Sequence, residues 1–152
     1  MSLRHLLAVL GTALLASATA LPINASEREI RNSVVLGALI YSDVCSNCHQ
    51  IDGYGEERLY PSLHRSALLK DRDLLIRTIL NGKTRHRSPG NGDQMQLMPA
   101  LGFLTNKEIV SIIAFITNSW GDDLLLVTEE EVERARKTLQ EQEQASQRSP
   151  EQ

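Results

Sequence analysis

The chain has 152 residues, a formal net charge of −3, and 41% hydrophobic but only 4% aromatic residues. This length suits a single domain with a core of its own. The 16 basic and 19 acidic side chains give none of the positive excess that marks a nucleic-acid-binding protein. The hydrophobic fraction excludes a wholly disordered chain, and two cysteines are too few for a disulfide scaffold.

Residues 1–20 have the pattern of an export signal. The basic pair Arg4-His5 precedes an apolar stretch over residues 6–15, and residues 18–20 give the small-x-small pattern of a cleavage site. A second possible cut follows Ala25. The apolar stretch is shorter than the roughly 20 residues of a membrane span, which disfavours an uncleaved anchor. We therefore expect an exported mature protein without stable membrane insertion.

The first helix is predicted from a capping pattern formed by Ser26 and Glu29. Behind this pair, apolar or small residues recur every three or four positions, as on one face of a helix: Ile30, Val34, Gly37, Tyr41 and Val44. Residues 50–70 are irregular, because glycines and a proline interrupt any periodicity.

Three further helices are predicted toward the carboxyl end. Asp71 is the expected N-cap of a short helix that ends at Asn81-Gly82. Residues 81–100 form a long loop, after which Thr105 with Glu108 opens a helix that stops near residues 120–121. Thr128 with Glu131 opens a polar helix through about residue 142, and residues 143–152 are expected to be disordered. No strand is predicted, so the fold class is all-α.

The segment Cys45-Ser46-Asn47-Cys48-His49 has the C-x-x-C-H spacing at which c-type haem is attached. Two thiols at this spacing on a helix end can reach the two vinyl groups of one porphyrin. The histidine that follows then lies over the iron and can donate an imidazole nitrogen.

Two other interpretations of the cysteine pair are weaker. A thiol–disulfide redox site usually accompanies a βαβ pattern, which the chain lacks. A zinc site needs two more ligands at close spacing, whereas His64 and His86 stand far apart in irregular segments, where we expect solvated side chains.

With these residues in hand, the chain resembles the class I c-type cytochromes, the small single-haem electron carriers of the bacterial periplasm. The resemblance covers about residues 28–121 and rests on the segments around Gly37 to His49, Gly53-x-Gly55, Tyr60 to Leu63, Met98-Pro99-Ala100, and Leu104 to Gly121. It implies an all-α cytochrome c fold over residues 26–121, with helices wrapped around one covalently bound haem. It also implies that the last helix of this domain crosses the first near Gly37. Residues 122–142 are then an extension with an extra C-terminal helix.

The resemblance also implies a role for each matching residue. Cys45 and Cys48 would hold the haem covalently, and His49 would be the proximal iron ligand. The carbonyl of Pro61 would accept the other imidazole N–H, Leu63 would pack against the porphyrin, and Met98 would be the distal ligand.

The distal ligand has rivals. Met95 lies in the same loop, although Pro99 and the spacing to Thr105 favour Met98. His86 or His64 in that position would give a bis-histidine haem of lower potential.

A haem iron held by His and Met has both axial positions filled, which suits electron carriage rather than catalysis. We expect a periplasmic dehydrogenase as donor and an oxidase or another cytochrome as acceptor. Two alternatives stay open: a non-catalytic subunit permanently docked to a larger oxidoreductase, and a haem-based binder of a small ligand.

Three features outside the motif bear on partners and packing. The basic cluster over residues 83–87 is either a solvated loop or a propionate contact and docking patch for an acidic partner. The extension after Gly121 is either a simply packed helix or a clasp for a dehydrogenase. Trp120 is expected to anchor packing, and Tyr41 and Phe115 are expected in the core at the helix crossing.

Overall fold

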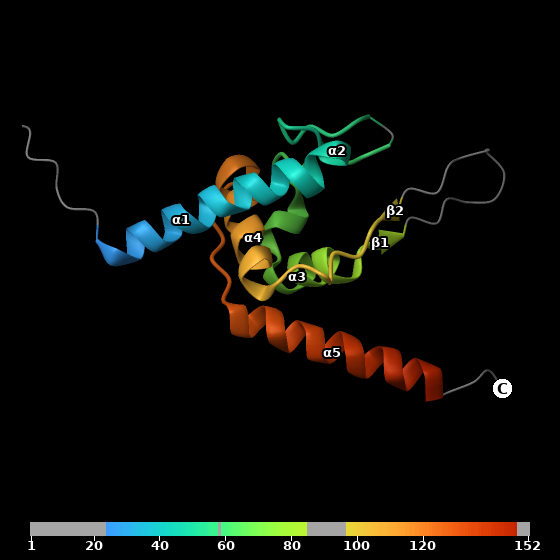
Figure 1. Ribbon diagram of the computed structural model, residues 1–152. Helices are drawn as coiled ribbons and strands as arrows, with labels where there is room; N and C mark the ends of the chain where they lie inside the picture. Colours follow the sequence, from blue (N-terminus) through green and yellow to red (C-terminus); the bar gives the residue numbers. More distant parts are fainter. Residues whose placement is uncertain (1–23, 58, 85–96, 149–152) are drawn as a thin grey trace, which may run out of the picture.

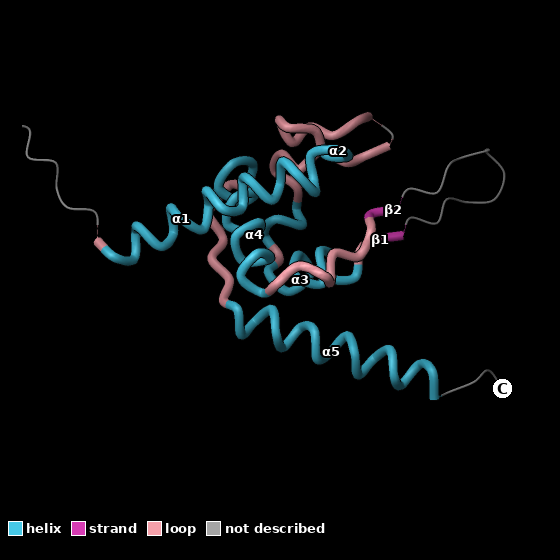
Figure 2. Tube along the Cα trace, in the orientation of Figure 1, coloured by secondary structure: helices cyan, strands magenta, loops and turns pink. Residues whose placement is uncertain are grey.

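The computed structural model describes residues 24–57, 59–84 and 97–148. In chain order it contains helix α1, a π-helical turn, helix α2, a 3₁₀ turn, helix α3, two short strands, and helices α4 and α5 (Figures 1 and 2). The expected all-α class is confirmed. The export signal over residues 1–20, Met95, His86 and residues 149–152 lie outside the described residues.

Helix α1 spans Ala25–Ile40 and begins at a different cap from the predicted one. The side chain of Asn24, rather than Ser26, accepts a hydrogen bond from the N–H of Glu27 at 2.8 Å, and the Glu27 carboxylate accepts one from the N–H of Asn24. The sequence contains two overlapping cap patterns. Asn caps a helix at least as well as Ser, and the earlier cap lengthens the helix.

Helices α3 (Arg72–Asn81) and α4 (Asn106–Trp120) begin and end where the sequence predicts. The Asp71 carboxylate accepts a hydrogen bond from a backbone N–H in the first turn of α3. Thr105 and Glu108 cap α4 reciprocally, each side chain accepting from the other residue's N–H. These local signals suffice because each cap satisfies backbone donors that the helix itself leaves unpaired.

Helices α1 and α4 cross each other (Figure 1), and Gly37 lies at their close approach. A Cβ atom on this glycine would lie 1.9 Å from the carbonyl oxygen of Ser111 and 2.7 Å from the Cβ of Phe115. Only a residue without a side chain lets the two backbones approach so closely. The crossing expected near Gly37 is therefore confirmed.

The core lies chiefly between α3 and α4. The stripe predicted on α4 is buried in full, and side chains of α3 meet it: Ile109, Ile112, Ile113 and Ile116 from α4, and Leu75, Ile76, Ile79 and Leu80 from α3. An aromatic cluster of Tyr41, Phe115 and Trp120 closes the end of this core near the crossing, with ring centroids 4.9–5.4 Å apart. Trp120 thus anchors packing, as predicted.

Two short elements differ from the prediction. A 3₁₀ turn at Ala67–Lys70 precedes α3 within the segment expected to be irregular. Strands β1 (Lys83–Thr84) and β2 (Leu97–Met98) form an antiparallel pair in which Lys83 lies opposite Met98. The expectation of no strand is therefore wrong, because a two-residue ladder is too short to leave a period in the sequence.

Helix α5 spans Glu129–Arg148 and is longer than predicted. Its start agrees with the prediction: the Glu131 carboxylate accepts from the N–H of Thr128 at 2.7 Å. The helix continues past residue 142, so residues 143–148 are helical rather than disordered. Most of these residues have good helix propensity, and no Gly or Pro occurs before Pro150. No helix in the described ranges has the length and hydrophobicity to span a bilayer.

Candidate functional site

The chemically distinctive residues lie where α1 ends. The helix continues from Ile40 into a π-helical turn, Tyr41–Cys45, and then into the single turn α2, Ser46–His49. Such π-turns are frequent at functional sites. The π-helical turn places Cys45 to His49 directly after the helix that packs on α4.

The imidazole of His49 is fixed by the next loop. Its Nδ1 lies 3.1 Å from the carbonyl oxygen of Pro61, and the tautomer with Nδ1 protonated donates a hydrogen bond there. Burial is the main influence on this imidazole and lowers the pKa of His49 below its usual value, against the opposing effect of the Pro61 carbonyl. A lowered pKa favours the neutral ring, in which Nε2 keeps a lone pair that can bind a metal.

Gly55 allows the loop after His49 to fold back so that Pro61 reaches it. Its φ is +68°, and its N–H donates to the carbonyl of His49 at 2.9 Å. A Cβ atom on Gly55 would lie 2.4 Å from the carbonyl oxygen of Tyr60, the residue before Pro61. A side chain at this position would push apart the two strands of the loop that bring Pro61 to His49.

The two thiols of Cys45 and Cys48 are free and half-buried. Burial, and to a smaller extent the charge of the nearby Cys48, raises the pKa of the Cys45 thiol to about 11. A redox-active C-x-x-C pair has the opposite property, a thiol pKa lowered toward or below neutral. The structure therefore disfavours the thiol–disulfide interpretation.

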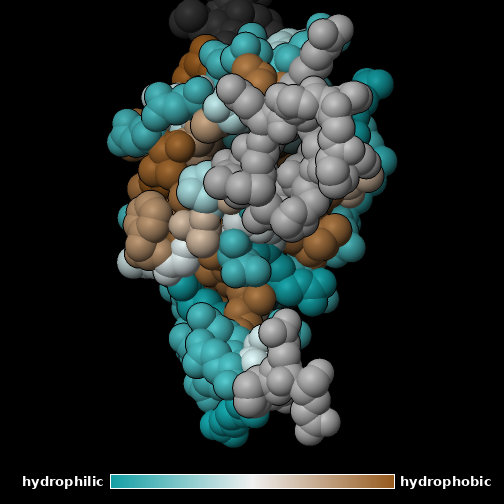
Figure 3. All heavy atoms as spheres, turned by 90° about the vertical axis from the view of Figure 1, so that its right-hand side faces the viewer, coloured by the Kyte–Doolittle hydropathy of each residue, from teal (hydrophilic) through white to brown (hydrophobic). Residues whose placement is uncertain are grey.

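Leu63 and Met98 are both half-buried and pack against the same core as Cys45. Met98 lies on β2, and its backbone lies against Gly82 at the end of α3. The approach is so close that a Cβ on Gly82 would lie 2.3 Å from the Met98 carbonyl oxygen. Residues from the first helix, the following loop and the β2 strand thus meet on one core. On the side of the molecule that Figure 3 shows, brown apolar surface lies around the grey atoms above the mostly teal α5.

His64 is not the solvated side chain predicted for this position. Its ring stacks on Tyr54, with centroids 3.9 Å apart and planes inclined by 12°, and lies 5.9 Å from the ring of Trp120. Its Nε2 lies 2.8 Å from the carbonyl oxygen of Asp52. These contacts tie His64 to the loop after His49, which disfavours the interpretation of His64 as a distal ligand.

The zinc interpretation has no support in the described part of the chain, where no three His, Cys, Asp or Glu side chains gather as metal ligands would. His86 lies outside the described residues, as do the rival Met95 and residues 85–87 of the basic cluster. The stacked pair of Tyr54 and His64 was missed by the sequence analysis, since neither residue belongs to a recognisable motif.

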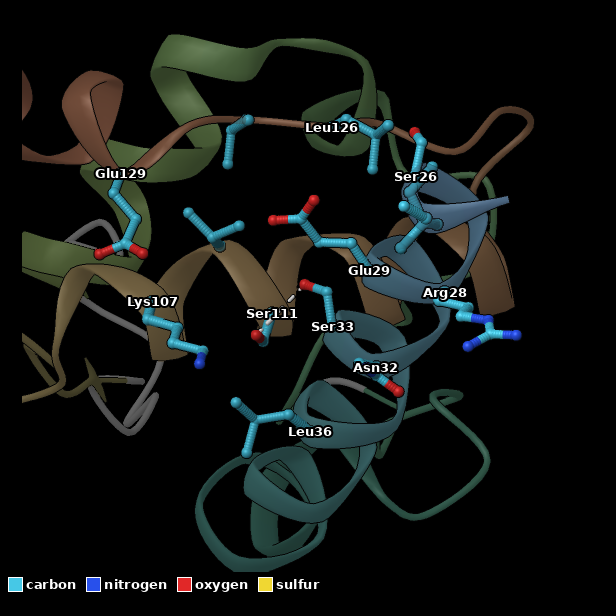
Figure 4. Close-up of a pocket in the computed structure, with 14 residues that line it drawn as sticks. Ser26, Arg28, Glu29, Asn32, Ser33, Leu36, Lys107, Ser111, Leu126 and Glu129 are labelled. Carbon is cyan, nitrogen blue, oxygen red and sulfur yellow. Dashed lines mark hydrogen bonds between the residues drawn. The ribbon is translucent and has the colours of Figure 1, made fainter. Parts of the chain in front are cut away.

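A groove of about 720 Å³ lies elsewhere, between α1 from Ala25 to Leu36, α4 and the segment that leads into α5 (Figure 4). Across its floor the hydroxyl of Ser33 donates to that of Ser111 at 3.2 Å. Its lining includes none of the C-x-x-C-H residues, so the groove is separate from the candidate site.

Comparison with known sequences identifies the family. The sequence model of the family described as "Cytochrome c" matches residues 34–120, more than half of the chain. The chain belongs to the cytochrome c family.

Two curated relatives are cytochrome subunits of dehydrogenases. The cytochrome c is 33% identical over 110 residues to the fructose dehydrogenase cytochrome subunit of Gluconobacter japonicus, covering 66% of this chain and 22% of the relative. It is 33% identical over 90 residues to the gluconate 2-dehydrogenase cytochrome c subunit of Pantoea cypripedii, covering 57% of this chain and 20% of the relative. The chain thus spans about a fifth of the length of these relatives.

The family implies a covalently bound haem c, and the residues of this cytochrome fit that group. Cys45 and Cys48 supply two thiols at the required spacing, His49 supplies a neutral imidazole with one nitrogen still available, and Met98 supplies a thioether. The family and the relatives together indicate an electron-transfer protein rather than an enzyme.

Proposed function

We propose that this cytochrome is a periplasmic one-electron carrier that holds one haem c between His49 and Met98. The observation that carries the proposal is the contact between His49 Nδ1 and the Pro61 carbonyl at 3.1 Å. A hydrogen bond of this kind fixes the tautomer and orientation of a ligating histidine and raises its basicity. It occurs next to both thiols of the C-x-x-C-H segment.

Each side chain then has one task. The Sγ atoms of Cys45 and Cys48 would hold the haem as thioethers with its two vinyl groups, the thiol hydrogens passing to the vinyl carbons. Nε2 of His49 and the sulfur of Met98 would bind the iron, which would leave no coordination site for a substrate. When bound, the haem supplies an iron that alternates between the ferric and ferrous states. A neutral thioether ligand and partial burial of the haem both favour the less charged, reduced iron and therefore raise the reduction potential of the haem.

For the partners, we propose a periplasmic dehydrogenase as donor and a respiratory oxidase or another cytochrome as acceptor. Both relatives are cytochrome subunits of sugar or sugar-acid dehydrogenases, which supports the donor class. The export pattern over residues 1–20 supports the compartment. Export predicts that mature protein isolated from a host able to attach c-type haem begins after Ala20 or after Ala25.

The deciding experiment is a redox titration of the visible haem spectrum of the exported protein, with Met98→Ala and Met95→Ala in parallel. We expect a low-spin haem whose potential falls sharply in Met98→Ala and stays unchanged in Met95→Ala, since only a thioether ligand raises the potential. The reverse pattern would assign Met95, and indifference to both would assign a histidine. Absence of a haem spectrum in a competent host would refute the proposal.

A second candidate is a subunit permanently docked to its dehydrogenase, which the subunit names of the relatives favour. The two candidates differ in their behaviour on size-exclusion chromatography of a periplasmic extract. A diffusible carrier elutes near its monomer mass of 16.9 kDa or slightly below, whereas a docked subunit elutes with the dehydrogenase activity.

A further inference from the structure

The C-terminal extension makes its most specific contacts through Arg136, on α5. The Arg136 guanidinium donates through Nη1 to the Gly102 carbonyl at 2.6 Å and through Nη2 to the Leu104 carbonyl. Its Nε donates to Oδ1 of Asn106 at 2.8 Å. One side chain of the extension thus binds the second half of the connection between Met98 and α4, from Gly102 to the first residue of α4. Hydrogen bonds from a charged donor are roughly twice as strong as neutral ones.

The connection is short and held at several points. It leaves β2 at Met98, where the ladder pairs it with Lys83. The N–H of Leu101 donates to the carbonyl of Ile79 at 3.0 Å, at the end of α3. Arg136 then binds the carbonyls of Gly102 and Leu104, so contacts from β1, α3 and α5 hold the connection between Met98 and the start of α4.

The orientation of Arg136 is itself fixed. Its partner Asn106 donates through Nδ2 to the Glu133 carboxylate at 3.1 Å, one turn earlier on α5. The helix is docked by the fully buried Val132 and by an ion pair of 2.7 Å between Arg72 and Glu131. Arg136 is therefore presented by a rigid element, and a rigid donor loses little entropy when it holds a loop.

We propose that Arg136 is a positioning residue for Met98: the extension straps the loop that carries the distal sulfur and so resists its departure from the iron. The inference rests on the proposed ligation by Met98. It gives the extension a task within this chain that neither a simply packed helix nor a clasp for a partner requires. Because a loop held at more points opens less often, loss of the strap raises the fraction of molecules with Met98 dissociated.

The test uses the haem-loaded, full-length protein and titrates ferric protein with imidazole, which binds the iron only when Met98 leaves. Arg136→Gln is compared with Arg134→Gln, a control that removes the same charge from an exposed position on the same helix. We expect Arg136→Gln to bind imidazole about tenfold more tightly, since the substitution removes hydrogen bonds from a charged donor. The thioether-to-iron charge-transfer band of this variant should be weaker than that of the wild type, or should disappear at a lower pH than it does in the wild type. We expect Arg134→Gln to match the wild type, and Arg136→Lys to be intermediate.

Val132→Ala separates positioning from simple loss of stability. It loosens α5 by removing buried methyl groups while leaving the Arg136 donors in place. If imidazole affinity follows the unfolding free energy across all variants on one line, or if Arg136→Gln equals Arg134→Gln, the inference is overturned. Met98→Ala identifies the other failure: if this variant binds imidazole like the wild type, Met98 is no ligand, and the proposed function falls together with the inference.

Discussion

The sharpest structural prediction concerns Gly37, where α1 and α4 cross. Replacement by alanine adds a Cβ that would lie 1.9 Å from the Ser111 carbonyl oxygen, whereas real Cβ contacts essentially never fall below 3.0 Å. The obstacle is backbone within a buried helix, so no side chain can rotate away. The two helices must separate by about 1 Å, and the packing of Phe115 across the crossing opens with them.

Two effects of opposite sign set the size of the change. Overpacking of a closely packed core costs about 1–3 kcal/mol and occasionally more. Alanine in place of glycine inside a helix returns about 1 kcal/mol. Because the clash is with a carbonyl of another helix, the cost lies at the top of its range. We expect Gly37→Ala to lower the unfolding free energy by about 2 kcal/mol, a large part of the 5–15 kcal/mol typical of a domain.

The assay is guanidinium unfolding of the haem-loaded protein, followed by far-ultraviolet circular dichroism. Gly102→Ala is the matched control: its Cβ would lie 3.4 Å from the Leu80 carbonyl oxygen, an ordinary contact, and its φ needs no glycine. We expect the control to stay within about 0.5 kcal/mol of the wild type. If Gly37→Ala unfolds like the control, or is stabilised as helix propensity alone demands, the close crossing is refuted.

Two further substitutions test local hydrogen bonds. Tyr41→Phe removes the hydroxyl that donates to the Gln50 carbonyl at 2.6 Å and should cost about 1–2 kcal/mol. Burial raises the pKa of Tyr41 well above its usual value, so the wild type loses stability as the pH rises beyond about 10. The variant should lack this alkaline loss when the unfolding free energy is measured across that pH range. An equal pH dependence in the two proteins would contradict the raised pKa of Tyr41. Thr105→Ala removes the N-cap of α4 and should cost about 1 kcal/mol in the same assay. The backbone N–H of Thr105 and then its hydroxyl lower the pKa of Glu108, so the capping contribution is present above the ordinary pKa of Glu108 and fades as the pH falls through the lowered one. Alanine keeps the backbone N–H and removes the hydroxyl, so the variant should lose part of this acid dependence; an unchanged acid limb would show that the hydroxyl takes no part in the cap.

Local signals predicted most of the helices correctly because each depends on residues close in sequence. The caps of α3 and α4 act within one turn, and the apolar stripe of α4 repeats at the helical period. The cap of α1 was misplaced because Asn24 and Ser26 offer overlapping patterns, between which only the hydrogen bonds decide. The far end of α5 was misplaced because residues 141–148 are all exposed, so no apolar stripe marks where the helix ends.

The parts that were missed depend on contacts between distant residues. The β1–β2 pair joins residues 83–84 to residues 97–98, and no two-residue strand has a readable period. The stack of His64 on Tyr54 and the hydrogen bonds from Arg136 across about 30 residues have no sequence signature either. The C-x-x-C-H segment was found because its chemistry itself requires a fixed local spacing.

One chain of contacts joins the helix crossing to the proposed proximal ligand. The crossing at Gly37 sets the position of α4, and the end of α4 carries Trp120. The Trp120 ring packs so closely on Gly53 that a Cβ there would lie 2.5 Å from it, and the Gly53 carbonyl accepts from the N–H of Leu63 at 2.8 Å. This bond holds the segment after Pro61, whose carbonyl fixes His49. The crossing should therefore affect the orientation of His49 as well as stability. An altered haem spectrum in folded Gly37→Ala would reveal that coupling, and an unchanged spectrum would confine the effect of the substitution to packing.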